Sequence, residues 1–274
     1  MNCGKSINIL SDKLKDTIMQ LQKNNMELER DIEEKSKIDE MRKQFISDVS
    51  HELKTPIALI QGYSEGLLEN VNSDEESRRF YAEVILDETN KMDKLVKQLL
   101  ELMKLEYGKR EFNNKEFDIN ELISEVIRRC KVMAEENNIT VEFQPKESLN
   151  VFADDFYIEQ VITNYFTNAI KNAKKINNEK KVCITTNIDK KLNKARISVF
   201  NTGENIPDED LDRIWGRFYK VDTSRNRNSG GSGIGLSLVK AIMSNYENNF
   251  GVINRENGVE FYFDIDLKNS IVNY

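Results

Sequence analysis

Hydrophobic residues recur at helical spacing along the first fifty residues of the chain. Between residues 14 and 32 they follow a seven-residue pattern at Leu14, Ile18, Leu21, Asn25, Leu28 and Ile32. This spacing predicts a short coiled coil, in which the polar Asn25 would fix register and dimeric state. The next apolar set begins at Ile38, six residues after Ile32, and so breaks the heptad phase. The break is either a functional feature of this helix or an incidental property of a plain connecting helix.

A second amphipathic stretch follows the short polar segment 70–72. Ser73 with Glu76 forms a plausible capping box at its start. Its apolar positions are Phe80, Val84, Leu86, Met92, Leu95, Leu99 and Leu102. Two long helices joined by so short a turn form a hairpin whose apolar stripe is only half covered. We therefore expect two copies to pair into a four-helix bundle, as a homodimer.

From residue 112 the pattern changes to shorter segments that alternate between strand and helix. Strands are predicted at 139–143, 181–188, 195–201, 250–254 and 259–265, and helices at 119–137, 154–174 and 235–245. The predicted fold class is α + α/β: a helical hairpin forming a dimeric four-helix bundle, then an α/β sandwich domain, with an N-terminal coiled-coil helix. The predicted boundaries are 1–37, 38–108 and 112–270. The chain lacks the P-loop and dinucleotide-binding glycine motifs, which disfavours those folds.

Composition and charge narrow the class of protein. A length of 274 residues with 39% hydrophobic residues is enough for about two domains. The net charge of -7 argues against nucleic acid as a partner. Cys3, Cys130 and Cys183 are far apart, which suggests neither disulfides nor a metal cluster and fits a reducing cytosol. No apolar run is long enough to span a bilayer, so we expect membrane attachment only through a missing N-terminal portion or a partner.

His51 is the single histidine of the chain. A lone histidine on a helix is usually a solvated or core residue. Its surroundings are more specific: Thr55 lies one helical turn further on, Glu52 is adjacent, and Pro56 follows. The segment Ser50-His51-Glu52-Leu53-Lys54-Thr55-Pro56 resembles the phosphoacceptor motif of the sensor histidine kinases of two-component systems.

Polar residues line one face of the predicted helix 154–174. Gln160, Asn164, Asn168 and Lys171 fall at intervals of four, four and three. Carboxamide oxygens suit Mg²⁺ and a lysine can neutralise phosphates, although a solvated polar face is an equal reading of these residues alone. Segment 161–169 resembles the asparagine-rich box of histidine-kinase ATP-binding domains. The resemblance implies that Asn168 is the Mg²⁺ ligand, that Asn164 assists, and that Lys171 contacts phosphate.

Four glycines in segment 229–236 precede the predicted helix 235–245. Such a loop lets backbone amides approach an anion, but alone it could equally be a linker. It follows segments 201–207 and 214–222, which resemble the first glycine box and the phenylalanine box of the same family. The resemblance covers about residues 38–267. Besides the asparagine box, the nucleotide-binding residues it implies are Asn201, Gly203, Lys220, Gly231, Gly233, Gly235 and Leu236. Lys220, and less certainly Arg217, would reach the transferring phosphate from a lid.

The chain departs from the family pattern in places. Asn201 stands where an aspartate usually receives the adenine amino group, so the hydrogen bond lacks charge assistance and ATP affinity is expected to be modest. Asn172 replaces the aromatic residue or histidine that often follows the box lysine, and segment 258–261 lacks the usual threonine. Segments 201–203 and 248–251 resemble the vancomycin-resistance type of sensor kinase.

The resemblance implies a protein-histidine kinase that uses ATP and Mg²⁺. His51 would attack the γ-phosphate while Glu52 orients the other ring proton, and the phosphoryl group would pass to an aspartate of a response-regulator receiver domain. Thr55 would position water to dephosphorylate that regulator. The chain as given is expected to be cytoplasmic, although the family is usually attached to the inner face of the plasma membrane.

Two alternatives remain open. A gyrase- or chaperone-type ATPase shares this nucleotide fold but carries a glutamate base where this chain has Asn164. A dimeric scaffold or phosphatase with weak kinase activity would bind nucleotide poorly because of Asn201.

Overall fold

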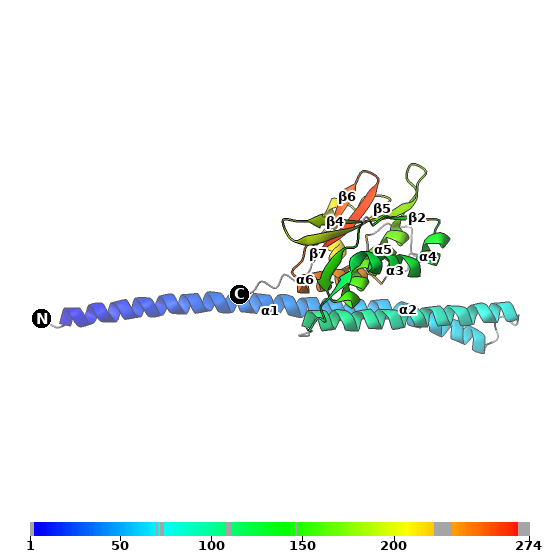
Figure 1. The fold of residues 1–274 in the computed structure, drawn as a ribbon. Helices are drawn as coiled ribbons and strands as arrows, with labels where there is room; N and C mark the ends of the chain where they lie inside the picture. The colour runs from blue at the N-terminus through cyan, green and yellow to red at the C-terminus, as the bar shows by residue number, and fades with distance from the viewer. Residues whose placement is uncertain are drawn as a thin grey trace. The chain divides into compact units, whose positions relative to one another are not determined.

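The computed structural model describes residues 3–69, 71, 74–107, 111–145, 147–221 and 232–267. The chain divides into two compact units, Met1–Tyr81 and Ala82–Tyr274. Figure 1 shows long helices in the N-terminal half of the chain and a sheet covered by helices in the C-terminal half. The predicted fold class, a helical hairpin followed by an α/β sandwich domain, is confirmed. In the described part of the chain no helix is both long and apolar enough to cross a bilayer.

Helix α1 (Cys3–Leu68) runs without interruption through the predicted coiled coil and the histidine segment. His51 therefore lies well inside the helix, which continues past Pro56. Pairs one turn apart support the polar faces, such as Lys43 with Asp39 at 2.8 Å. The described heptad positions Ile18, Leu21, Leu28 and Ile32 are all exposed in the single chain. The predicted coiled coil thus requires a second helix to cover this stripe.

Aromatic side chains pack together where α1 and α2 meet at the hairpin. Tyr63 of α1 packs edge-on against Phe80 and Tyr81 at the start of α2 (Glu75–Tyr107), with centroid separations of 6.1 and 5.0 Å. Asp74 caps α2 by accepting a hydrogen bond from the backbone N–H of Ser77 at 2.8 Å. The predicted cap Ser73 lies outside the described residues.

The sheet of the second unit has five strands in the order β2-β4-β5-β7-β6, and β2–β4 is its parallel pair. The strands are β2 (Thr140–Phe143), β4 (Lys181–Asp189), β5 (Lys194–Thr202), β6 (Phe250–Arg255) and β7 (Gly258–Asp266). All five were predicted from alternating apolar positions to within one residue at each end. A two-stranded sheet of β1 (Lys115–Asp118) and β3 (Asn150–Ala153) was not predicted.

Helices α3 (Ile119–Arg129), α4 (Lys131–Glu136), α5 (Asp155–Asn172) and α6 (Gly235–Asn245) complete this unit. The predicted helix 119–137 was wrong in its continuity, because it is interrupted at Cys130. Helix α5 buries an apolar face that includes Tyr165, whose ring lies 5.3 Å from that of Phe261 on β7. Because this face is committed to the core, the polar residues of α5 lie on the other side of the helix.

Candidate functional site

His51 lies exposed on α1. Together with Lys54, Thr55, Ala58 and Leu59 it lines a hollow of about 420 Å³ on the helix surface. Thr55 is also exposed, so the imidazole and the hydroxyl of Thr55 face the same hollow one turn apart. A second molecule can therefore reach both groups from solvent.

Pro56 removes one backbone hydrogen bond from the helical turn that follows His51. Proline has no N–H to donate, so the carbonyl of Glu52, four residues earlier, loses its usual helical partner. Glu52 is half-buried and immediately follows His51. The predicted triad of His51, Glu52 and Thr55 is thus contained within one and a half helical turns.

Asn164 connects α5 to the start of α6. Its amide nitrogen donates to the carbonyl of Gln160 at 2.9 Å. A Cβ atom placed on Gly235, the first residue of α6, would lie only 2.7 Å from Asn164 Oδ1. The amide oxygen therefore faces the helix N-terminus that follows the glycine-rich loop, and only glycine fits there without displacing it.

Asn168, the predicted Mg²⁺ ligand, is half-buried one turn further along α5. Its Oδ1 accepts a hydrogen bond from Asn172 Nδ2 at 2.8 Å, and Asn172 Nδ2 also donates to the Asn168 backbone carbonyl at 2.9 Å. The orientation of the Asn168 amide is thus set by another side chain of the same helix.

Lys171 lies near this amide on α5. Partial burial lowers the pKa of the Lys171 ammonium below its ordinary value, and the like charge of Lys94 lowers it further. The side chain still reaches solvent. A phosphate next to Lys171 would offset both effects, since an anion favours the charged form.

The glycine-rich segment 229–236, the second glycine box, is hydrogen-bonded to the phenylalanine box (214–222). Gly233 has a φ of 70°, and a Cβ atom there would lie 2.7 Å from the backbone of Phe218. The Phe218 N–H donates to the Gly233 carbonyl at 2.9 Å. Leu236 follows in the first turn of α6, whereas Gly231 lies outside the described residues, as do residues 222–231 of the predicted lid.

The first glycine box lies against the end of α5. Asn201, at the end of β5, is 3% exposed and donates from its amide nitrogen to the Thr202 carbonyl at 3.1 Å. A Cβ atom on Gly203 would lie 3.1 Å from the backbone oxygen of Asn172. The Lys174 N–H donates to the Thr202 carbonyl at 2.9 Å. The structure thus brings the asparagine box and the first glycine box together.

These groups fit Mg²⁺ and a nucleotide. Carboxamide oxygens are hard ligands, and Mg²⁺ in nucleotide sites typically takes one or two protein ligands and several from phosphates and water. The backbone at Gly233 and Gly235 leads into a helix N-terminus, which favours anions. Within the described ranges no cluster of three His, Cys, Asp or Glu side chains could hold a metal. The asparagine face of α5 is therefore the better candidate.

The predicted lid cations differ in their surroundings. Arg217 forms an ion pair with Glu106 of α2, so in this structure its guanidinium is held by a carboxylate. Lys220 is exposed and precedes Val221, the last described residue before segment 222–231.

Sequence reasoning missed a cluster that anchors the base of the lid. Tyr219 Oη donates to Asp210, which is 7% exposed, and the guanidinium of Arg213 lies 4.9 Å from the Tyr219 ring centroid. The two 3₁₀ turns Asp208–Asp210 and Arg213–Trp215 place these groups. The charged residues of segment 208–213 are the signal that could have indicated it.

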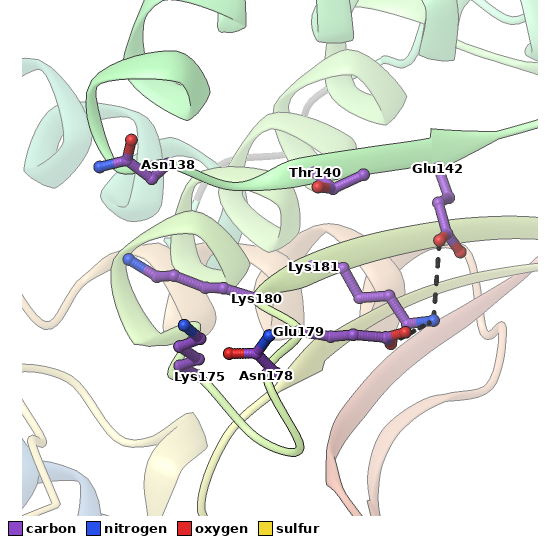
Figure 2. A pocket seen from close by; sticks show the side chains of 8 residues that line it. All are labelled: Asn138, Thr140, Glu142, Lys175, Asn178, Glu179, Lys180 and Lys181. Atoms are coloured by element: carbon purple, nitrogen blue, oxygen red, sulfur yellow. Dashed lines mark ion pairs between the residues drawn. The ribbon is translucent and has the colours of Figure 1, made fainter.

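A separate hollow of about 400 Å³ lies beside β2 and β4, as Figure 2 shows. Its lining is polar, and its cations largely have partners: Lys181 pairs with Glu179 at 3.2 Å and with Glu142 at 3.6 Å, and Lys180 donates to the backbone carbonyl of Asn137 at 2.7 Å. None of the predicted site residues lines this hollow, and we assign it no ligand.

Two family models match the chain. Residues 41–108 match the His Kinase A (phospho-acceptor) domain. Residues 153–269 match the family of histidine kinase-, DNA gyrase B-, and HSP90-like ATPases. The sensor protein kinase WalK of Staphylococcus aureus is 32% identical over 213 residues, which cover 78% of this chain and 50% of that protein. The chain spans half or less of the length of the curated relatives it matches.

Solved structures give the same fold. Histidine kinase ThkA, in complex with response regulator protein TrrA, is similar with a TM-score of 0.64 and 29% identity, over 82% of this chain and 61% of that one. Histidine kinase AdeS of Acinetobacter baumannii matches with a TM-score of 0.66 and 22% identity, over 80% of this chain and 98% of that one. The similarity to AdeS concerns the fold alone. The resemblance to the vancomycin-resistance type stays a prediction.

Proposed function

Because the chain belongs to the sensor histidine kinases of two-component systems, we propose that it phosphorylates His51 from ATP and passes the phosphoryl group to an aspartate of a response-regulator receiver domain. The observation that carries the proposal is the exposed His51, within the match to the phospho-acceptor domain, in a chain that also has an ATPase domain. The proposed boundaries are 1–37 for the signalling helix, 38–108 for the phosphoacceptor domain and 112–270 for the ATP-binding domain.

The reaction at His51 is a nucleophilic substitution at phosphorus. A lone pair of one imidazole nitrogen forms the N–P bond as the bond from the γ-phosphorus to the β–γ bridging oxygen breaks, and ADP leaves with that electron pair. The other ring nitrogen carries the proton, which Glu52 orients or accepts. Exposure of His51 allows the phosphorylated ring to meet the receiver aspartate in turn.

We assign ATP to the face formed by α5, the first glycine box and the start of α6. Asn201 would accept a hydrogen bond from the adenine amino group, and Lys171 would bind phosphate. Gly203, Gly233, Gly235 and Leu236 would bring the backbone close to the nucleotide, and Lys220 and Gly231 would act from the lid. Mg²⁺, when bound, would neutralise phosphate charge, and Asn168 with help from Asn164 would hold it. ATP and receiver domains are both found in the cytoplasm, which is the proposed site of action.

The homodimer is supported by apolar surface that the single chain leaves uncovered. On α2 the exposed Val96, Leu100 and Met103 follow helical spacing and form a second stripe, about 100° around the helix from the buried Leu95, Leu99 and Leu102. On α1, Ile46, Ile57 and Leu59 are exposed as well. Two apolar stripes on one helix are what a helix in a four-helix bundle needs.

A phosphatase activity is the second candidate, favoured by Thr55. Its exposed hydroxyl lies in the same hollow as His51, where it could hold a water molecule for attack on the phosphorylated aspartate of a receiver domain. Thr55→Ala should then abolish dephosphorylation and leave His51 labelling intact, measured with a phosphorylated receiver domain and with labelled ATP.

The kinase is tested by incubating the protein with γ-³²P-ATP and Mg²⁺ beside the variants His51→Gln and Asn168→Ala. Label that is acid-labile, alkali-stable and absent from both variants is the expected result. An Asn187→Ala variant, which alters an exposed strand residue away from the site, should label normally. Absence of label in a protein that binds ATP would contradict the kinase and favour the scaffold.

A further inference from the structure

We propose that Asn172 is a positioning residue for Mg²⁺, acting through the side chain of Asn168. The inference rests on the proposed function, in which Asn168 is the metal ligand. It concerns a residue at which this chain departs from the pattern often found in its family.

The side-chain amide of Asn172 donates two hydrogen bonds, and both acceptors belong to Asn168. Helix α5 ends at Asn172, and the Asn172 Nδ2 donates to Asn168 Oδ1 at 2.8 Å and to the Asn168 backbone carbonyl at 2.9 Å. The backbone bond anchors the Asn172 side chain along the helix, and the other bond then reaches the Asn168 side chain. The second bond joins two side chains one helical turn apart, so it supports the helix only weakly.

The bond at Oδ1 decides which end of the Asn168 amide is the oxygen. A carboxamide can turn by 180° about its last torsion, which exchanges the oxygen for an NH₂ group that repels a cation. A donor fixed beside Oδ1 disfavours that rotation. A carbonyl oxygen has two lone pairs, so the bond from Asn172 uses one and leaves the other for the metal. Residues that orient a metal ligand in this way typically change metal affinity by about 10- to 100-fold.

The backbone of Asn172 is held independently of its side chain. Its carbonyl lies 3.1 Å from the position of a Cβ on Gly203, and two residues later the Lys174 N–H donates to the Thr202 carbonyl at 2.9 Å. Replacement of Asn172 by alanine should therefore remove the two side-chain bonds and leave the end of α5 in place.

Mg²⁺ is titrated against the full chain with the fluorescent nucleotide trinitrophenyl-ATP, and nucleotide affinity is also measured in EDTA. For Asn172→Ala we expect the Mg²⁺ concentration at half-maximal metal-dependent binding to rise about tenfold. Affinity in EDTA should stay within about twofold, because Asn172 acts on the metal ligand. Asn137→Ala is the matched control: Asn137 also ends a helix, and its amide donates to the carbonyl four residues earlier, Met133, at 2.8 Å.

The double variant Asn168→Ala/Asn172→Ala separates positioning from direct binding. If Asn172 acts through Asn168, the second substitution adds no further increase in the Mg²⁺ requirement to that of Asn168→Ala alone. An unchanged Mg²⁺ requirement in Asn172→Ala, with a fall in melting temperature equal to that of Asn137→Ala, would reduce Asn172 to a helix-end residue and overturn the inference. Failure of the unaltered chain to bind nucleotide with Mg²⁺ would instead overturn the proposed function, and the inference with it.

Discussion

At the scale of single residues, Gly233 shows how tightly the nucleotide loop is built. Its φ of 70° lies in the left-handed region, and the Phe218 backbone occupies the space where a side chain would begin. The hydrogen bond from Phe218 to Gly233 holds the two boxes at this separation. The glycine-rich loop is thus fixed at this point.

Gly233→Ala should lower nucleotide affinity at least tenfold, because the added methyl forces the loop away from Phe218 in addition to about 1 kcal/mol of backbone strain. Gly62→Ala provides the comparison, since no atom lies within 4 Å of the new Cβ on α1. That substitution should stabilise the helix by about 0.5–1 kcal/mol and leave nucleotide binding unchanged. Nucleotide affinity is measured by titration with trinitrophenyl-ATP, and stability by thermal melting, for both variants. Equal nucleotide affinities of Gly233→Ala and Gly62→Ala would contradict the assignment of Gly233 to the nucleotide site.

Other residues of the site differ in how far the sequence could predict them. The spacing of Asn164 and Asn168 places them on one helical face from sequence alone. The bond from Asn172 to Asn168 could not be predicted in this way, because it depends on side-chain torsions at a helix end. The cluster of Asp210, Arg213 and Tyr219 is marked in the sequence only by the charged residues of segment 208–213, because the two 3₁₀ turns that bring its members together follow no apolar pattern.

At the scale of elements, short polar segments determine where helices begin. Asp118 ends β1 and caps α3: its carboxylate accepts hydrogen bonds from the Asn120 N–H at 2.8 Å, the Ser148 hydroxyl at 2.6 Å and the Leu149 N–H at 3.3 Å. Burial alone would raise the pKa of Asp118, but these donors favour the charged form and hold the pKa below its ordinary value.

Asp118→Ala should lower the free energy of unfolding by about 1–2 kcal/mol at pH 7. The pKa is lower in the folded state than in the unfolded state, so the stabilisation is present above the unfolded pKa of about 4 and is lost as the pH falls through the folded value. The difference in the free energy of unfolding between the wild type and Asp118→Ala should therefore become smaller below about pH 4. Urea unfolding from pH 3 to pH 7 measures it, and Asp118→Asn, which keeps an acceptor without a charge, should lose less at pH 7. A gap that widens in acid would contradict the assignment.

The sheet carries an ion pair between adjacent strands, in which a buried aspartate meets a partly exposed arginine. Arg196 on β5 makes two hydrogen bonds to Asp264 on β7, at 2.7 and 2.9 Å, and its guanidinium lies 4.2 Å from the Tyr262 ring centroid. Asp264 is 3% exposed and also accepts a hydrogen bond from Asn249 Nδ2 at 3.4 Å. The hydrogen bond to Asp264 raises the pKa of Arg196 above its ordinary value.

Arg196→Met should destabilise the second unit by about 3 kcal/mol, because it leaves a buried carboxylate without its partner. The double variant Arg196→Met/Asp264→Asn should recover part of that loss, since no charge remains to be buried. Chemical unfolding of the wild type and the two variants provides the measurement. Equal losses in the single and double variants would show that the charge of Asp264 is solvated without Arg196.

The elements themselves were predictable where a long apolar pattern exists. The five strands of the main sheet and helix α6 follow such patterns. Strands β1 and β3 do not alternate between apolar and polar residues, unlike the equally short β2, so no strand pattern marks them. The interruption at Cys130 has neither glycine nor proline to mark it, so the sequence predicted a continuous helix.

At the scale of the whole molecule, the uncovered apolar stripe on α2 predicts the assembly. Leu100 is 57% exposed although its neighbours Leu99 and Leu102 are buried. An isolated chain would leave this surface in water, at a cost of roughly 25 cal/mol for each Å².

Leu100→Lys should shift the protein from dimer to monomer, because two like charges would meet in the proposed bundle. Asn90→Lys places the same charge at an exposed polar position of α2 and should leave the dimer intact. Sedimentation velocity at several concentrations distinguishes the species. A monomeric parent protein, or a dimer that tolerates Leu100→Lys, would contradict this interface.

The uninterrupted helix α1 has a mechanical consequence. Its 66 residues extend over about 100 Å at a rise of 1.5 Å per residue. The hydrogen-bond ladder first loses a donor at Pro56, beyond His51, so an uninterrupted helix leads from Cys3 to the proposed phosphorylation site. A rotation of the N-terminal end about the helix axis would therefore also rotate the imidazole of His51. Inserting a single residue near Ser36 would rotate the preceding part of the helix by about 100° relative to His51, so the angular setting of this helix could regulate the proposed kinase.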